Sequence, residues 1–175
     1  SKNLADGLGS FWFPRFAEVA HTYYWGHPPL VFGIQSLFFK FLGSSIYVER
    51  AYSFLAACIT AWLIILVWKE IFQSEHELKK LSWLPVLWWI ISPVSFWAYT
   101  NNVLENTMGI FTLAAVLFIL KGLNAKFPLN KGGQGVVLFF ILSGIFIFFA
   151  SLSKGIQGTF PIAVIGFYWI THRKI

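Results

Sequence analysis

The chain has 175 residues, of which 57% are hydrophobic, 20% aromatic and only 11% charged, whereas an average soluble domain is roughly 45–50% apolar and about 25% charged. This composition excludes a soluble globule and a disordered chain, and it indicates a protein that faces lipid. The formal net charge of +6 does not indicate nucleic acid as a partner, because the basic residues are spread over short loops and form no stripe. Cys58 is the single cysteine, which excludes a disulfide framework and a cysteine metal site.

Residues 1–50 are predicted to form an extracytoplasmic loop that contains one helix in the plane of the membrane. The apolar segment 30–42 has only 13 residues, which at about 1.5 Å each cannot cross a hydrocarbon core of roughly 30 Å. One helical face carries the apolar residues Leu30, Ile34, Leu37, Phe38 and Phe41, and another carries Gly33, Ser36 and Lys40. Two prolines at 28 and 29 suit the first turn, where their missing N–H groups would have no partner anyway. We therefore expect an amphipathic helix in the membrane interface.

The rest of the chain, 51–175, is predicted to be a bundle of about five transmembrane helices, because apolar runs there approach the ~20 residues that span a bilayer. The expected spans are 51–68, 81–99, 103–120, 136–152 and 156–170. The predicted fold is therefore all-α, a polytopic transmembrane helix bundle. The chain begins with Ser1, has no signal peptide and stops soon after an apolar run, so it is interpreted as a piece of a longer membrane domain.

The distribution of Lys and Arg predicts how the bundle is oriented. If the connector 69–80 is cytoplasmic, that side holds Lys69, Lys79, Lys80, Lys121, Lys126, Lys131, Arg173 and Lys174. The other side holds Lys2, Arg15, Lys40, Arg50 and Lys154. Because cytoplasmic loops are enriched in Lys and Arg, this excess favours a cytoplasmic connector.

With this orientation, polar residues from several turns converge on the non-cytoplasmic face. They are His27, Glu49, Arg50, Asn101, Asn102, Glu105, Asn106, Ser153, Lys154 and Gln157. Glu105 and Lys154 are the most informative, because apolar sequence flanks each of them and a charge at the centre of a membrane helix costs at least about 2.5–3.5 kcal/mol. One interpretation is an ion pair, or two side chains that reach the headgroups. The interpretation we favour is a carboxylate and a cation that line a water-accessible cavity for a charged ligand.

The other polar residues have simpler explanations beside the functional one. Three asparagines are typical of a turn or a helix cap, and this interpretation is favoured over ligand binding. They are Asn101, Asn102 and Asn106. Among the remaining residues, His27 is distinguished only by its position before the two prolines. Arg50 fits a local pair with Glu49, a contact with anionic headgroups, or a ligand contact equally well.

Five segments, taken in order, resemble the N-terminal membrane portion of GT-C glycosyltransferases. They are WFPRF (12–16), YYWGHPPLVFGIQSLFFKFLG (23–43), ERAYSFLAA (49–57), NNVLENTMGIFTLAA (101–115) and ASLSKGIQGTFP (150–161). The ordered set is specific: a Pro-Pro-Leu in-plane helix, an Arg opening the next span, an acidic residue opening a later span, and a Lys-Gly after the next. The chain most resembles the dolichyl-phosphate-mannose protein mannosyltransferase-like group, which includes the bacterial aminoarabinose transferases that modify lipid A.

The resemblance implies a membrane glycosyltransferase that moves a sugar from a polyprenyl-phosphate carrier to a protein, lipid or glycan acceptor on the extracytoplasmic face. The implied location is a bacterial inner membrane, with the active site facing the periplasm or the exterior. Glu105 falls where relatives place an acidic residue at the edge of the active cavity, and Lys154 matches the family's Lys-Gly. The residues expected to bind lipid phosphate or sugar are His27, Arg50, Lys154, Asn101, Asn102, Asn106 and Gln157. No cofactor is predicted, and a divalent metal ion is left open.

Two departures from the family pattern limit the resemblance. His27 stands where aminoarabinose transferases have a Lys, which argues against that subfamily. The family's first catalytic carboxylate lies far ahead of the Pro-Pro pair, and Asp6 matches it poorly, so the 175 residues alone are expected to be inactive. The alternative function is a fragment of a transporter or channel in which Glu105 and Lys154 lie on the substrate path. A purely structural subunit is the least favoured possibility.

Overall fold

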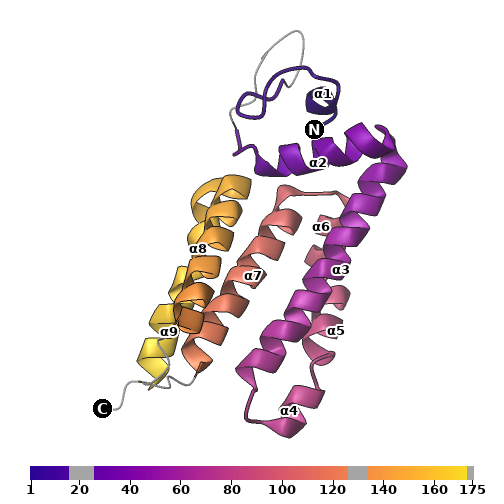
Figure 1. Cartoon of the computed structure of the whole chain (residues 1–175). Coiled ribbons are helices and arrows are strands. Elements are labelled where there is room, and N and C mark those ends of the chain that lie inside the picture. The colour runs from indigo at the N-terminus through magenta and orange to yellow at the C-terminus, as the bar shows by residue number, and fades with distance from the viewer. Residues whose placement is uncertain (16–25, 126–133, 173–175) are drawn as a thin grey trace.

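The computed structural model of the chain describes residues 1–15, 26–125 and 134–172, and within these ranges it consists of helices and loops without a strand (Figure 1). Three helical stretches in these ranges are long and apolar enough to cross a bilayer: α3 (Ile46–Ile71), α7 (Leu104–Asn124) and Gly135–Thr159, which contains most of α8 (Gln134–Lys154). Helix α7 packs against both α3 and α8. The predicted all-α membrane bundle is confirmed.

The long helices extend beyond their predicted bounds, and this changes where the charged residues lie. Helix α3 begins at Ile46 rather than at 51, because the Ser45 hydroxyl caps it by accepting a hydrogen bond from the Val48 backbone N–H at 3.4 Å. Glu49 and Arg50 therefore belong to the first two turns of α3 rather than to the preceding loop. Helix α8 likewise continues through Lys154, beyond the predicted end at 152.

Helix α2 (Leu30–Leu42) has the predicted bounds and lies across one end of the bundle, beneath the N-terminal segment that includes α1 (Lys2–Ala5) (Figure 1). Its apolar residues Leu37 and Phe41 are exposed, as a lipid-facing side would be. On the opposite face, Lys40 is exposed, but the part around Gly33 and Ser36 is covered by protein. A Cβ at Gly33 would lie 2.6 Å from the Phe11 ring, and Ser36 is buried with its hydroxyl donating to the Gly33 carbonyl.

The segment predicted as a single span over 81–99 is divided into two helices, α5 (Leu84–Ile91) and α6 (Pro93–Thr100). Pro93 has no N–H to donate and disfavours a helical conformation at the residue before it, so Ser92 is extended, with φ −66° and ψ 122°. Both short helices pack along α3 (Figure 1). They follow the connector that contains α4 (His76–Lys80).

Apolar and polar contacts together hold α2, α3 and α7. Leu63 of α3 packs against Ala114 and Leu117 of α7 in the buried core. Nearer to α2, the Tyr52 hydroxyl of α3 and the Thr107 hydroxyl of α7 share a buried hydrogen bond of 2.6 Å. The Phe38 ring of α2 meets the Tyr52 ring edge to face, with centroids 5.1 Å apart. Tyr52 therefore joins the crossing helix to both long helices.

The chain reverses direction after α8. A 3₁₀ helix, η1 (Gly155–Thr159), makes the turn, and α9 (Ile162–His172) follows and contacts α7. The predicted segment 156–170 is thus divided between η1 and α9. Gly155 ends α8 with φ +74°, and Pro161 precedes α9.

Candidate functional site

The end of the bundle beneath α2 brings together the predicted charged residues of α7 and α8. Glu105 lies in the first turn of α7, and Lys154 is the last residue of α8. Both positions suit the helix macrodipole, which favours a carboxylate at an N-terminus and a cation at a C-terminus. The two helices are antiparallel neighbours, so these termini meet at the same end (Figure 1).

Glu105 and Lys154 form an ion pair, in which Lys154 Nζ donates to Glu105 Oε1. The Lys154 side chain is 19% exposed and the Glu105 side chain 46% exposed. The structure therefore matches the interpretation of Glu105 and Lys154 as an ion pair. Because the carboxylate is still nearly half exposed, it also remains accessible to a ligand that approaches this end of the bundle.

The turn after Lys154 is built so that η1 folds back tightly on α8. A Cβ at Gly158 would lie 2.2 Å from the Ser151 backbone nitrogen and 2.3 Å from the Ala150 carbonyl carbon. Ser153 is fully buried and donates to the Phe149 carbonyl at 2.8 Å. Sequence reasoning did not identify Gly158 as important, because two glycines in a short stretch form no recognised motif. The only sequence signal for Gly158 is its position shortly after the Lys154-Gly155 pair.

A chain of polar side chains connects α2, the α6–α7 turn and α3. Gln35 Nε2 donates to Asn102 Oδ1 at 3.0 Å, and Asn102 Nδ2 donates to Glu49 Oε1 at 3.3 Å. Asn102 adopts φ +50°, a left-handed conformation that Asn tolerates better than most residues. Gln35 is buried and was missed by the sequence analysis, since a Gln within an amphipathic helix usually faces water.

The two other predicted asparagines bond to the backbone of the α6–α7 turn. Asn101 Nδ2 donates to the Trp97 carbonyl at 2.8 Å, and the buried Asn106 donates through Nδ2 to the Ala98 carbonyl at 2.9 Å. The same two carbonyls also accept backbone hydrogen bonds, from the Asn101 and Val103 N–H groups, so the side chains reinforce the end of α6. The interpretation of the asparagines as turn and cap residues accounts for both contacts.

The remaining predicted residues lie around the same end of the bundle. His27 is half-buried in the segment that leads into α2, and Gln157 is exposed in η1. Arg50 is exposed on α3 and forms no ion pair with any carboxylate of the described residues. The described ranges also contain no group of three or more His, Cys, Asp or Glu side chains placed to hold a metal ion.

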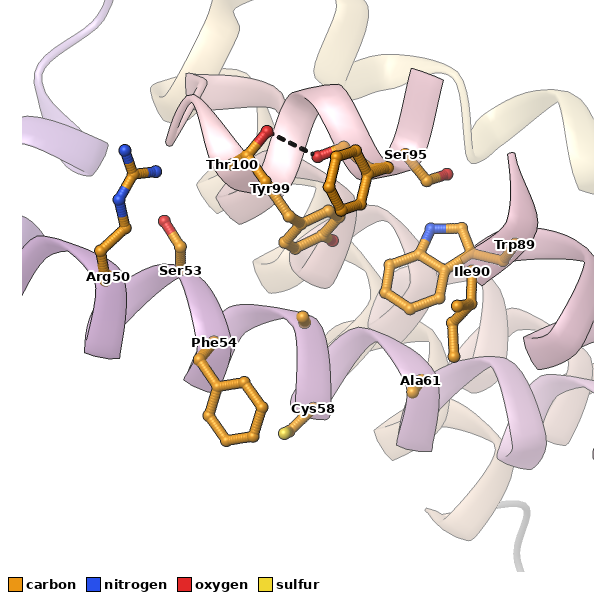
Figure 2. A pocket seen from close by; sticks show the side chains of 12 residues that line it. Arg50, Ser53, Phe54, Cys58, Ala61, Trp89, Ile90, Ser95, Tyr99 and Thr100 are labelled. Carbon is orange, nitrogen blue, oxygen red and sulfur yellow. Dashed lines mark hydrogen bonds between the residues drawn. The ribbon is translucent and has the colours of Figure 1, made fainter. Parts of the chain in front are cut away.

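An apolar groove of about 580 Å³ lies between α3 and the broken pair α5 and α6 (Figure 2). Its walls are formed by Phe54, Ala57, Cys58, Ala61, Trp89, Ile90, Phe96 and Tyr99. Arg50 and Ser53 lie at one end of the groove, and Ala61 and Trp89 lie at the other (Figure 2). The sequence analysis did not predict this groove, because it expected one uninterrupted helix over 81–99.

This helical arrangement, with apolar spans and a polar cluster at one end, defines an integral membrane protein of the all-α class. The family model for dolichyl-phosphate-mannose-protein mannosyltransferases matches residues 26–175, and the chain belongs to this family of GT-C glycosyltransferases. The family uses polyprenyl-phosphate sugar donors in a membrane setting. Comparison with curated proteins and with solved structures gives no match.

Proposed function

We propose that this protein transfers a sugar from a polyprenyl-phosphate carrier to a hydroxyl of a protein, lipid or glycan acceptor, at the extracytoplasmic face of a bacterial inner membrane. The observation that carries the proposal is the contact between Glu105 and Lys154, which joins two helices at one end of the bundle in a member of a glycosyltransferase family. A base and a cation side by side are the two groups that such a transfer needs. The family also favours this function over a transporter.

In the proposed reaction, the acceptor oxygen forms a bond to the anomeric carbon of the sugar. The bond between that carbon and the phosphate oxygen breaks, and its electron pair leaves with the phosphate. Glu105 takes the proton of the acceptor hydroxyl, and the configuration at the anomeric carbon is inverted. The leaving phosphate needs no proton, so one base is sufficient.

Lys154 has two roles in this proposal. Without donor, it neutralises Glu105 through the ion pair. When the donor binds, its phosphate competes for the same ammonium group, and Lys154 then stabilises the charge that develops on the departing oxygen. Loss of the lysine contact frees Glu105 to act as a base. Donor binding would thereby produce the active form of the carboxylate.

The other predicted residues have supporting roles in the proposal. Arg50 adds positive charge near the phosphate, His27 contributes a ring N–H as a hydrogen-bond donor, and Gln157, exposed in η1, contacts the sugar hydroxyls. The asparagine side chains already bond to protein atoms, so they hold the α6–α7 turn from which Glu105 projects. They are Asn101, Asn102 and Asn106.

The proposed function is tested by incubating membranes that contain the complete gene product with defined polyprenyl-phosphate sugars. The expected result is a glycosylated acceptor with the opposite anomeric configuration to the donor. Product with retained configuration would contradict the single displacement. Transfer from nucleotide sugars, with none from any polyprenyl-phosphate sugar, would overturn the proposal.

A further inference from the structure

Gln35 connects α2, the helix that lies across the end of the bundle, to the turn before α7 (Figure 1). The residue is 7% exposed, whereas Leu37 and Phe41 of the same helix are exposed. Both polar atoms of its amide have partners: the Ser1 hydroxyl donates to Oε1 at 2.8 Å, and Nε2 donates to Asn102 Oδ1 at 3.0 Å. Because an unsatisfied polar group is costly when buried, these bonds hold α2 and Asn102 in a fixed relation.

The direction of these hydrogen bonds is set at Glu49, where the series Gln35–Asn102–Glu49 ends. An ionised carboxylate only accepts hydrogen bonds, so Asn102 presents its NH₂ group to Glu49, with Nδ2 at 3.3 Å from Oε1. The Asn102 oxygen is then directed at Gln35, which in turn presents its own NH₂ group. Each amide therefore has one favoured orientation. A carboxylate at position 35 would face the Asn102 oxygen and would break the series.

The first turn of α7, which carries Glu105, has no side-chain cap of its own. Its N-cap is Val103, whose side chain cannot accept a hydrogen bond from the backbone. On the far side of Glu105, the buried bond between Tyr52 and Thr107 fixes α7 to α3. On the near side, Asn102 joins the chain to both α2 and α3. Glu105 thus lies between two points of attachment, and the nearer end of α7 is the one that α2 holds through Gln35.

We propose that Gln35 is a positioning residue for sugar transfer: through Asn102 it fixes the first turn of α7, and with it the place of Glu105 against the bound substrates. The inference rests on the proposed function for the role of Glu105 as the base. Gln35 acts only through Asn102 and touches no reacting atom. A displacement of about 1 Å at a catalytic group can reduce turnover by about 10²-fold, whereas the residues that bind substrate are unaltered. Loss of the Gln35 contact should therefore lower kcat and leave KM unchanged.

The test exchanges the two ends of the series in the complete gene product. In Gln35→Glu, carboxylates at positions 35 and 49 face one Asn102 amide, whose oxygen must oppose one of them, although the Ser1 hydroxyl can still donate to position 35. Adding Glu49→Gln supplies an NH₂ group on the opposite side. The Asn102 amide then turns over, and the hydrogen bonds re-form in the reverse direction. The double variant has the same composition and net charge as the wild type.

We expect Gln35→Glu to lower kcat, measured per folded protein, by about 10–10²-fold with an unchanged KM for the polyprenyl-phosphate sugar. The double variant should return kcat close to the wild-type value. Gln73→Glu is the matched control, because Gln73 also donates to a glutamate, Glu70, but in the exposed connector. This control should leave kcat unchanged.

Hydrogen–deuterium exchange of the segment 101–107 gives a second readout, which does not depend on activity. Exchange there should rise in Gln35→Glu and return to the wild-type level in the double variant. Wild-type kcat in Gln35→Glu would overturn the inference, and so would a raised KM with unchanged kcat, which would place Gln35 at the substrate. A double variant that stays at the low kcat, or that does not fold, would also overturn it, because the reversed series would then not restore the site.

The two readouts separate failure of the inference from failure of the proposed function. A wild-type protein that transfers no sugar from any polyprenyl-phosphate donor overturns the function, and the exchange data then decide by themselves whether Gln35 fixes the first turn of α7. A wild-type protein that transfers sugar, with Gln35→Glu equal to it in kcat and in exchange, supports the function and overturns the inference.

Discussion

Gly158 of η1 lies against the backbone of Ser151 in α8, so closely that a Cβ on Gly158 would come within 2.2 Å of the Ser151 nitrogen. A clash with backbone cannot be relieved by rotating a side chain. The contact therefore fixes the turn that follows Lys154, and with it the end of α8 at which the ion pair with Glu105 forms.

Replacing Gly158 by alanine should displace η1 and destabilise the protein by about 1–3 kcal/mol, the usual cost of an added methyl group in a tightly packed place. Gly144→Ala is the matched control, because Gly144 lies within α8 and a Cβ there meets nothing within 4 Å. The control should be neutral or stabilising by about 0.5–1 kcal/mol. Thermal unfolding in detergent, followed by tryptophan fluorescence, measures both. Equal unfolding temperatures for the two variants would show that the close contact does not matter.

Glu105→Gln in the complete gene product should reduce sugar transfer by about 10²–10⁴-fold, the usual contribution of a general base. Lys154→Gln should reduce it by about 10²–10³-fold, since a charge-stabilising group is lost. The control is Glu77→Gln, which removes the carboxylate of a second ion pair, with Lys80, in the connector. Transfer by the control should remain at the wild-type rate.

The doubly exchanged variant, Glu105→Lys with Lys154→Glu, distinguishes a catalytic pair from a structural one. The attraction between the helix ends is retained in this variant, although each charge now opposes the local helix dipole. We expect it to fold and to transfer no sugar, because base and cation have changed places. Circular dichroism and the transfer assay provide the two readouts. A folded exchange variant with normal transfer would show that the pair only joins the helices.

Asn102→Ala should destabilise the protein more than Asn102→Gly. Both variants lose the hydrogen bonds to Gln35 and Glu49, but only glycine accepts φ +50° without cost. The difference should be about 1–2 kcal/mol, the penalty for a left-handed conformation in a residue with a Cβ. Chemical unfolding in mixed micelles measures the free energy of each variant. If both variants unfold alike, the left-handed conformation is not what selects asparagine.

The orientation of the bundle is tested by cysteine labelling in a Cys58→Ser background. A cysteine at Asn101, which is exposed on the α6–α7 turn, should react with a membrane-impermeant maleimide added outside intact cells. A cysteine at Glu75, exposed in the connector before α4, should react only after the membrane is opened. The reverse pattern would mean that the excess of Lys and Arg does not set the topology of this protein.

The helical membrane class, the family and the bounds of α2 were all predictable from the sequence, because these depend on composition, on the length of apolar runs, and on motifs that are local in the chain. It also singled out Glu105 and Lys154, since a charge within apolar sequence is visible without coordinates. The prediction of a single helix over 81–99 was wrong, because it relied on the apolar character of the segment and did not consider that Pro93 interrupts the helix.

Which side chains meet depends on how the helices pack against one another in three dimensions. Glu105 and Lys154 are 49 positions apart in the sequence, and nothing in that spacing indicates that they form a pair, because the contact depends on the antiparallel packing of α7 and α8. The hydrogen bond between Gln35 and Asn102, the contact of Gly158 with α8, and the groove between α3, α5 and α6 likewise depend on how the helices pack. Hydropathy records whether a residue prefers lipid, but a binding site is defined by distances between helices, and these arise only when the helices pack.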